Sequence, residues 1–98
     1  MLTPEGKQLI AKYMGWMCPI IDQTMPCIRL LKKNYKIVNF DLNDASLVVA
    51  EMQKREEWEH DFMDFVAGSQ KWNYHQLIAW LFNADNFFKS FTEWRKTK

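Results

Sequence analysis

Eight apolar residues near the C-terminus recur at the spacing of one helix face, and they limit the fold more than any other feature of the sequence. They fall at i, i+3, i+4 and i+7, and are Leu77, Trp80, Leu81, Ala84, Phe87, Phe88, Phe91 and Trp94. Polar residues fill the opposite face, as in an amphipathic helix. Asn73 and Gln76 have the spacing of a capping box at its start. The pattern predicts a long helix over 74–96, with a break at Asn83–Asp85 as the alternative.

Helix signals also frame the N-terminal part of the chain. The segment Thr3–Glu5 combines an N-cap residue, a proline at the first helical position and an acid in the first turn. Gly15 is placed to end this helix. A second helix is predicted to begin at Asp22 or Thr24 and to end at Asn34.

Between these helices the pattern changes to that of a strand. Residues 35–42 alternate apolar and polar side chains, which predicts a strand. Residues 47–52 can be read as the second strand of a hairpin or as part of a helix capped by Asp44. The hairpin is favoured because a lone strand has no ladder partner. Both readings place a helix from about residue 55 to 67, ended by Gly68.

Length and composition fit one small domain spanning residues 1–98, with an apolar fraction of 48%. The predicted fold class is α+β and predominantly helical: two N-terminal helices, a short strand or hairpin, then helices that include the long amphipathic one at the C-terminus. The sequence has no membrane-length apolar run and does not begin like a secretory signal. We therefore expect a cytoplasmic protein, in which Cys18 and Cys27 are two unlinked thiols.

Charge is segregated along the chain although the net charge is only +1. Residues 1–42, 43–68 and 69–98 carry net charges of +3, −5 and +3 in turn. Segregated fields of one sign steer partners, and the acidic block together with nearby aromatic residues predicts a protein-binding surface. Its residues are Glu51, Glu56, Glu57, Glu59, Asp61, Asp64, Trp58 and Trp72. The alternative is the solvated face of an amphipathic helix.

Neither catalytic nor cofactor motifs are recognisable, so we predict that the chain is not an enzyme and binds no cofactor. Glu56, His60 and Asp64 would share one face of a helix, but this spacing is common in charged helices and we predict no metal site. Cys18 lacks the sequence surroundings of an activated nucleophile.

Two short stretches carry a resemblance to a known family. Residues 9–16, Leu-Ile-Ala-Lys-Tyr-Met-Gly-Trp, resemble the opening of small proteins from phages and prophages of gut bacteria, described as a phage α-β-α sandwich family. Residues 22–26, followed by Leu30 and the segment 35–37, resemble that family's helix running into a strand, although the family has a tryptophan where this chain has Gln23. The resemblance covers about the first 45 residues. It implies a layered α/β fold and a mobile-element origin, and it assigns no catalytic residues.

These observations predict a non-enzymatic protein-interaction module of phage or mobile-element type, which inhibits a host defence protein in the host cytoplasm. The surplus of aromatic rings leaves a homodimer as a further option. The balanced total charge disfavours nucleic acid as a partner. The alternative function is nevertheless a small nucleic-acid-associated regulator that uses the basic residues Arg29, Lys32, Lys33 and Lys36.

Overall fold

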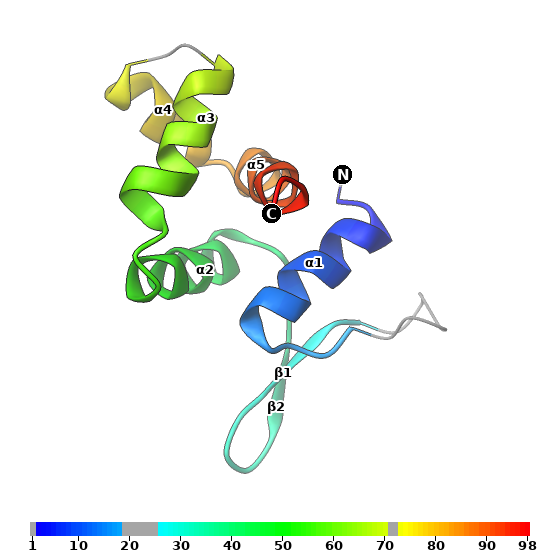
Figure 1. Cartoon of the computed structure of the whole chain (residues 1–98). Coiled ribbons are helices and arrows are strands. Elements are labelled where there is room, and N and C mark those ends of the chain that lie inside the picture. The colour runs from blue at the N-terminus through cyan, green and yellow to red at the C-terminus, as the bar shows by residue number, and fades with distance from the viewer. Residues whose placement is uncertain (1, 19–25, 71–72) are drawn as a thin grey trace.

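The computed structural model describes residues 2–18, 26–70 and 73–98. Within these residues five α-helices form the body of the molecule, and a π-helix over Trp58–Phe62 leads into the third of them. The α-helices are α1 (Pro4–Met14), α2 (Leu42–Lys54), α3 (Met63–Gln70), α4 (Tyr74–Leu81) and α5 (Ala84–Lys96). Strands β1 (Ile28–Leu30) and β2 (Tyr35–Ile37) form an antiparallel hairpin that extends away from the helices (Figure 1). The predominantly helical α+β class is therefore confirmed.

Helix α5 lies at the centre of the body, where α1, α2, α3 and α4 all contact it and its apolar stripe is buried. The rings of Phe88 and Phe91 are 1% and 0% exposed. Helix α1 packs against α5, and the ring of Tyr13 meets the ring of Phe91 edge-on at 5.1 Å between centroids. Thr3 caps α1 and Gly15 ends it in the left-handed conformation, as the sequence predicts.

The single helix predicted over 74–96 is divided into α4 and α5, at the break that was the alternative. Asn83 adopts an extended conformation, and its side chain accepts a hydrogen bond from the backbone N–H of Asn86. The side chain of Asn86 in turn donates to the carbonyl of Trp80 at 3.1 Å. These polar contacts start a new helix. Leu77 and Leu81 of α4 then pack back onto the same core.

Residues 42–54 form helix α2, so the preferred prediction of a second strand at 47–52 is wrong. The reason is a capping box in which Asp41 and Asp44 each accept the other's backbone N–H. Reciprocal capping satisfies two donors at a helix start, which a hairpin turn at this point would leave to water. Val48 and Met52 then face the core.

Helix α2 ends at a sharp turn around Glu56, whose φ is 59°. The chain restarts as the π-helix, which stacks the ring of Trp58 on that of Phe62 at 5.6 Å. Helix α3 follows and continues through Gly68 to Gln70, so the predicted end at Gly68 is wrong. Helix interiors tolerate a glycine when neighbouring turns are held by packing, and Val66 is buried here.

The hairpin pairs β1 with β2 rather than β2 with a later segment. Residues 28–30 were predicted to be helical, and this prediction is wrong. The strand candidate at 35–42 is confirmed only for Tyr35–Ile37. An isolated bridge from Met17 to Ile28 extends the pairing on the other side of β1. The predicted helix start at Asp22 or Thr24 lies outside the described residues.

Within the described ranges, the helices are all too short or too polar to cross a bilayer.

Candidate functional site

Three of the six acidic residues predicted to bind a partner form ion pairs or hydrogen bonds within the chain. Glu51 forms an ion pair with Arg55 at 2.7 Å, one helical turn apart. Glu57 and Asp61 accept hydrogen bonds from side chains of other helices. The remaining acids, Glu56, Glu59 and Asp64, are exposed.

Glu57 is held at the junction of α1, α5 and the turn that ends α2. The hydroxyl of Tyr13 donates to Glu57 Oε1 at 2.7 Å, and Arg95 Nη1 lies 3.7 Å from Glu57 Oε2. The guanidinium of Arg55 covers the Tyr13 ring at 4.0 Å and donates to the Tyr13 carbonyl. Burial, and then the hydrogen bond to Glu57, raises the pKa of Tyr13. The phenol therefore stays protonated and remains a donor.

Asp61 supplies the partner that the buried indole of Trp94 needs. Trp94 Nε1 donates to Asp61 Oδ1 at 2.9 Å, and Lys98 Nζ lies 2.6 Å from Asp61 Oδ2. The hydrogen bond from Lys98, followed by that from Trp94, lowers the pKa of Asp61. A buried indole N–H without an acceptor would be costly, so this carboxylate serves the fold.

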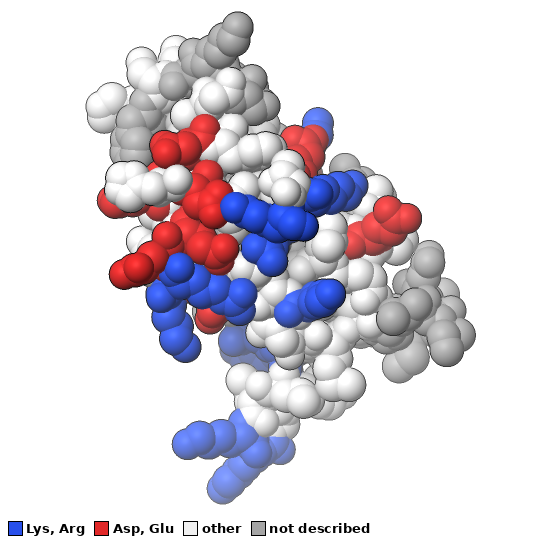
Figure 2. Space-filling model, viewed as in Figure 1, with Lys and Arg blue, Asp and Glu red and all other residues white. Residues whose placement is uncertain are grey.

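The acidic block is thus partly neutralised where it meets the body, and Figure 2 shows acidic and basic side chains side by side on this face. Trp58 is half-buried on Phe62, and Trp72 lies outside the described residues. An exposed acidic surface remains, defined by Glu56, Glu59 and Asp64.

The hairpin presents one wholly apolar face. Ile28 is paired with Ile37, Leu30 with Tyr35, and Met17 with Ile28. Paired residues share a face of a sheet and alternate residues do too, so all five lie on the same side. Four of these side chains are largely exposed: Met17 54%, Leu30 65%, Tyr35 61% and Ile37 53%. We call these five residues the apolar face.

The side chains on the opposite side of the hairpin are buried at its base and basic towards its turn. At its base Cys27 and Val38 are buried against the body. Further out Arg29 and Lys36 lie directly opposite each other, and like charges in this position destabilise a strand pair. Lys32 and Lys33 occupy the exposed turn, and basic side chains project from this end of the molecule in Figure 2. Arg29, Lys32, Lys33 and Lys36 are the four residues named for the alternative function, and they do lie together.

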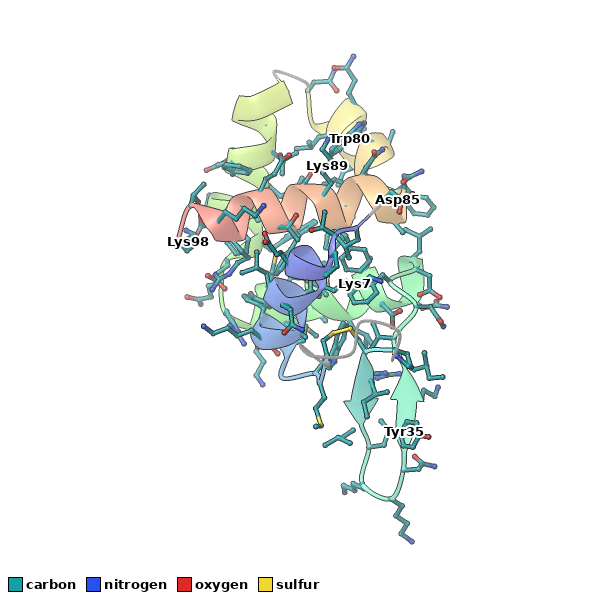
Figure 3. All side chains as sticks on the ribbon, turned by 90° about the vertical axis from the view of Figure 1, so that its right-hand side faces the viewer. Lys7, Tyr35, Trp80, Asp85, Lys89 and Lys98 are labelled. Carbon is teal, nitrogen blue, oxygen red and sulfur yellow. A yellow bond between two sulfur atoms is a disulfide. The ribbon has the colours of Figure 1, made fainter. Side chains whose placement is uncertain are left out.

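A groove of about 1180 Å³ separates the apolar face from helix α1. Leu9 and Trp16 contribute to one wall and Ile28 and Ile37 to the other. Charged residues at the groove are Glu5, Lys12 and Lys96, which leaves a basic surplus. Tyr35, labelled in Figure 3, lines the groove from the outer strand, well away from α5.

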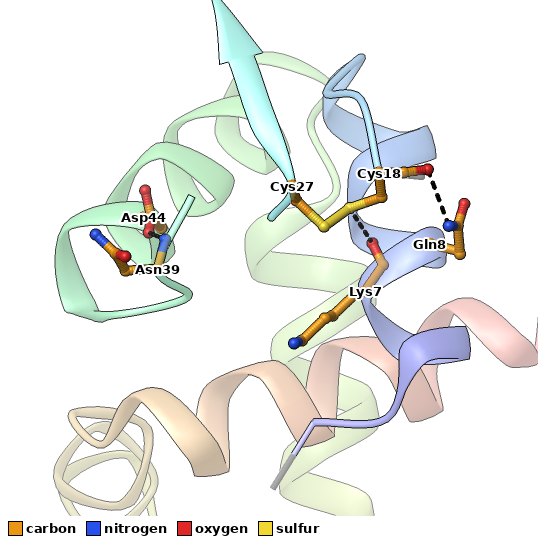
Figure 4. Close-up of a disulfide and its surroundings, with 6 residues drawn as sticks. All are labelled: Lys7, Gln8, Cys18, Cys27, Asn39 and Asp44. Atoms are coloured by element: carbon orange, nitrogen blue, oxygen red, sulfur yellow. Dashed lines mark hydrogen bonds between the residues drawn. A yellow bond between two sulfur atoms is a disulfide. The ribbon is translucent and has the colours of Figure 1, made fainter. Parts of the chain in front are cut away.

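A disulfide beside this groove joins Cys18 to Cys27, the residue directly before β1, so the prediction of unlinked thiols is wrong for the structure. Cys18 and Cys27 are bonded, with their Cα atoms 4.2 Å apart (Figure 4). Met17 and Ile28 exchange both backbone hydrogen bonds, at 2.9 and 2.8 Å. The next pair along an antiparallel ladder is the closely spaced one, which brings the two cysteines together. Gln8 Nε2 also donates to the Cys18 carbonyl at 3.0 Å.

A second, smaller apolar spot surrounds Phe82, which is 75% exposed between α4 and α5. It adjoins a hollow of about 450 Å³ that Leu42, Trp58 and Ile78 help to line. Phe87, which also lines this hollow, is itself buried in the core. The spot carries few charges, so it gives less indication of a partner than the hairpin does.

Sequence reasoning missed the hairpin because it assigned residues 28–34 to a helix. The available signal was the repeat of apolar and basic residues on both sides of the turn at 31–34: Ile28-Arg29-Leu30 before it and Tyr35-Lys36-Ile37 after it. Such alternation on both sides of a turn is typical of a hairpin with two different faces.

Within residues 2–18, 26–70 and 73–98, no three histidine, cysteine, aspartate or glutamate side chains are grouped as metal ligands would be. No family model matches the sequence, and neither the curated proteins nor the solved structures include a match to it. The residues themselves are therefore the basis for a functional proposal.

Proposed function

We propose that this chain is a non-enzymatic protein-interaction module that binds an acidic partner protein through its hairpin and the adjoining groove. One observation carries the proposal: a projecting hairpin joins an exposed apolar face to four basic residues. The solvent-exposed members of the apolar face are Met17, Leu30, Tyr35 and Ile37. Contiguous exposed apolar side chains with a polar rim are typical of protein-binding surfaces.

The energetics of the hairpin support a bound partner. A two-stranded hairpin is marginal by itself in water, and this one exposes its apolar face and opposes Arg29 to Lys36. An acidic, partly apolar partner would cover the face and neutralise the opposed charges. Complementary charge also speeds association.

Nucleic acid is the second candidate, because Arg29, Lys32, Lys33 and Lys36 all belong to the hairpin and its turn. Phosphate contacts would employ those cations. They would leave the four exposed apolar side chains uncovered, and this difference favours a protein.

The phage-family resemblance of residues 9–16 extends the proposal to the partner's origin. We propose a host defence protein as the partner, inhibited by occupation of its own acidic surface, in the host cytoplasm. The exposed acids Glu56, Glu59 and Asp64 form the alternative binding surface.

The test captures partners from a host lysate with two matched triple variants. The hairpin variant carries Lys32→Glu, Lys33→Glu and Lys36→Glu, and the acidic variant carries Glu56→Lys, Glu59→Lys and Asp64→Lys. Glu57 is left intact because Tyr13 and Arg95 bind it. A negative charge at position 36 should pair with Arg29, so we expect the hairpin variant to keep the circular dichroism spectrum of the original protein. The acidic variant should keep it as well, because its three positions are exposed.

We expect the original chain and the acidic variant to capture the same protein, and the hairpin variant to lose it. The difference should be largest at low salt, where exposed charges are least screened. Capture that survives in the hairpin variant and disappears in the acidic variant would move the site to the acidic surface. Capture that nuclease treatment abolishes would establish the nucleic-acid alternative instead.

A further inference from the structure

Strand β2 has an outer edge whose backbone groups are directed away from β1. The ladder bonds run from Val38 N–H to the Cys27 carbonyl at 2.8 Å and from Leu31 N–H to the Asn34 carbonyl at 2.7 Å. Backbone groups in an antiparallel ladder alternate between facing the partner strand and facing away from it. The N–H and C=O groups of Tyr35 and Ile37 therefore point outward.

The next outward donor along the chain has a partner within the molecule. Asn39 N–H donates to Asp44 Oδ2 at 2.9 Å, and Asp44 is buried at the start of α2 (Figure 4). The open edge therefore ends before Asn39, whose backbone N–H is already bonded. Among the described residues, none bonds to the outward groups of Tyr35 and Ile37, so the open stretch extends over β2.

From this edge, and resting on the proposed function of the hairpin, we infer that β2 binds an extended acidic segment of the partner as an added strand. Strand addition obtains affinity from main-chain hydrogen bonds and specificity from alternate side chains. Here the added strand would place two apolar residues beside Tyr35 and Ile37, on the apolar face. The residue between them would lie beside Lys36, on the other side of the sheet.

The charges of the hairpin specify that middle residue as an acid. Lys36 already faces Arg29 within the hairpin, and an aspartate or glutamate beside Lys36 would neutralise the like-charge pair. A second copy of this chain is a poor occupant of the edge, because its own β2 would bring Lys36 against Lys36. Lysine on an edge strand commonly prevents such pairing between copies. The recognised pattern is therefore apolar, acidic, apolar in an extended chain.

The experiment uses the full chain and short acetylated peptides in which valine and glutamate alternate. The parent peptide is compared with one whose valine amides are N-methylated, one whose glutamate amides are N-methylated, and one with lysine for glutamate. Only one set of peptide amides can face β2. An antiparallel added strand would present its valine amides to Tyr35 and Ile37, and a parallel one its glutamate amides.

We expect the parent peptide to bind and to slow amide hydrogen exchange at Tyr35 and Ile37, and the lysine peptide not to bind. One methylated peptide should bind about tenfold more weakly than the parent, through loss of its main-chain bonds, while the other binds like the parent. Equal behaviour of the two methylated peptides, or binding by no peptide, overturns strand addition.

These outcomes are separate from the test of the proposed function. If the hairpin variant loses the captured protein but the two methylated peptides behave alike, the hairpin remains the docking surface without strand addition. If the hairpin variant keeps the captured protein, the proposed function fails whatever the peptides do. The parent and lysine peptides together report the charge of the surface that binds them. Only a basic surface prefers the acidic parent peptide, so this preference excludes binding at an acidic site.

Discussion

Replacing Phe88 with alanine is expected to lower the free energy of unfolding by about 3–5 kcal/mol through lost burial and a residual cavity. Phe88 is 1% exposed, and its ring meets those of Phe87 and Phe40 at 5.2 and 5.5 Å. The neighbouring Lys89, labelled in Figure 3, is exposed. Lys89→Ala is the matched control and should change the free energy by less than about 0.5 kcal/mol.

Urea unfolding followed by circular dichroism measures the difference. Similar midpoints for the two variants would contradict the position of α5 at the centre of the core. Phe40 connects this core to the hairpin, because it follows β2 and packs on both Phe88 and Trp16. Phe88→Ala should therefore also loosen the base of the hairpin, seen as faster amide exchange near Val38.

Removing the disulfide is expected to cost about 2–3 kcal/mol of stability, because the bond closes a short loop in the unfolded chain. Cys18 and Cys27 are separated by 9 positions. The double variant Cys18→Ser, Cys27→Ser should melt at lower temperature than the original protein under oxidising conditions. With excess reductant the two proteins should melt together, and the serine variant should not respond to reductant. A reductant-insensitive original protein would contradict the bond.

The disulfide also bears on where the protein works. Cytoplasmic thiols are normally kept reduced, whereas disulfides persist in oxidising compartments, so this bond and the predicted cytoplasmic location point in opposite directions. Alkylation in acid-quenched cells, followed by mass spectrometry without reductant, distinguishes them. A protein that takes up no alkyl group at Cys18 or Cys27 carries the bond in the cell.

The parts of the fold that were predictable are those that local chemistry determines. The caps of α1 and α4 can be read from Thr3 and from the pair Asn73 and Gln76, because each cap involves residues only three positions apart. The buried stripe of α5 follows from its spacing. Even the break at Asn83 was visible as a polar interruption, although its outcome depends on the hydrogen bond from Asn86 to Trp80.

The parts that were missed depend on partners far apart in the sequence. Tyr13 and Glu57 are separated by 44 positions, and Asp61 and Trp94 by 33, so nothing near Glu57 or Asp61 reveals that they serve the fold. Strand β1 is the exception, because its partner β2 is close in the sequence and the apolar and basic repeat on both sides of the turn at 31–34 indicates the hairpin. The candidate site therefore moved from the acidic block, where half of the acids are internally paired, to the hairpin.

Site-specific photo-cross-linking tests the central claim, that the hairpin is the docking surface, most directly. A photoreactive residue replaces Tyr35 in one variant, Glu59 in a second and Phe82 in a third; all three side chains are exposed. In a host lysate we expect only the variant at Tyr35 to cross-link to the protein that the hairpin variant fails to capture. Cross-links to that protein from Glu59 or Phe82, with none from Tyr35, would contradict the account.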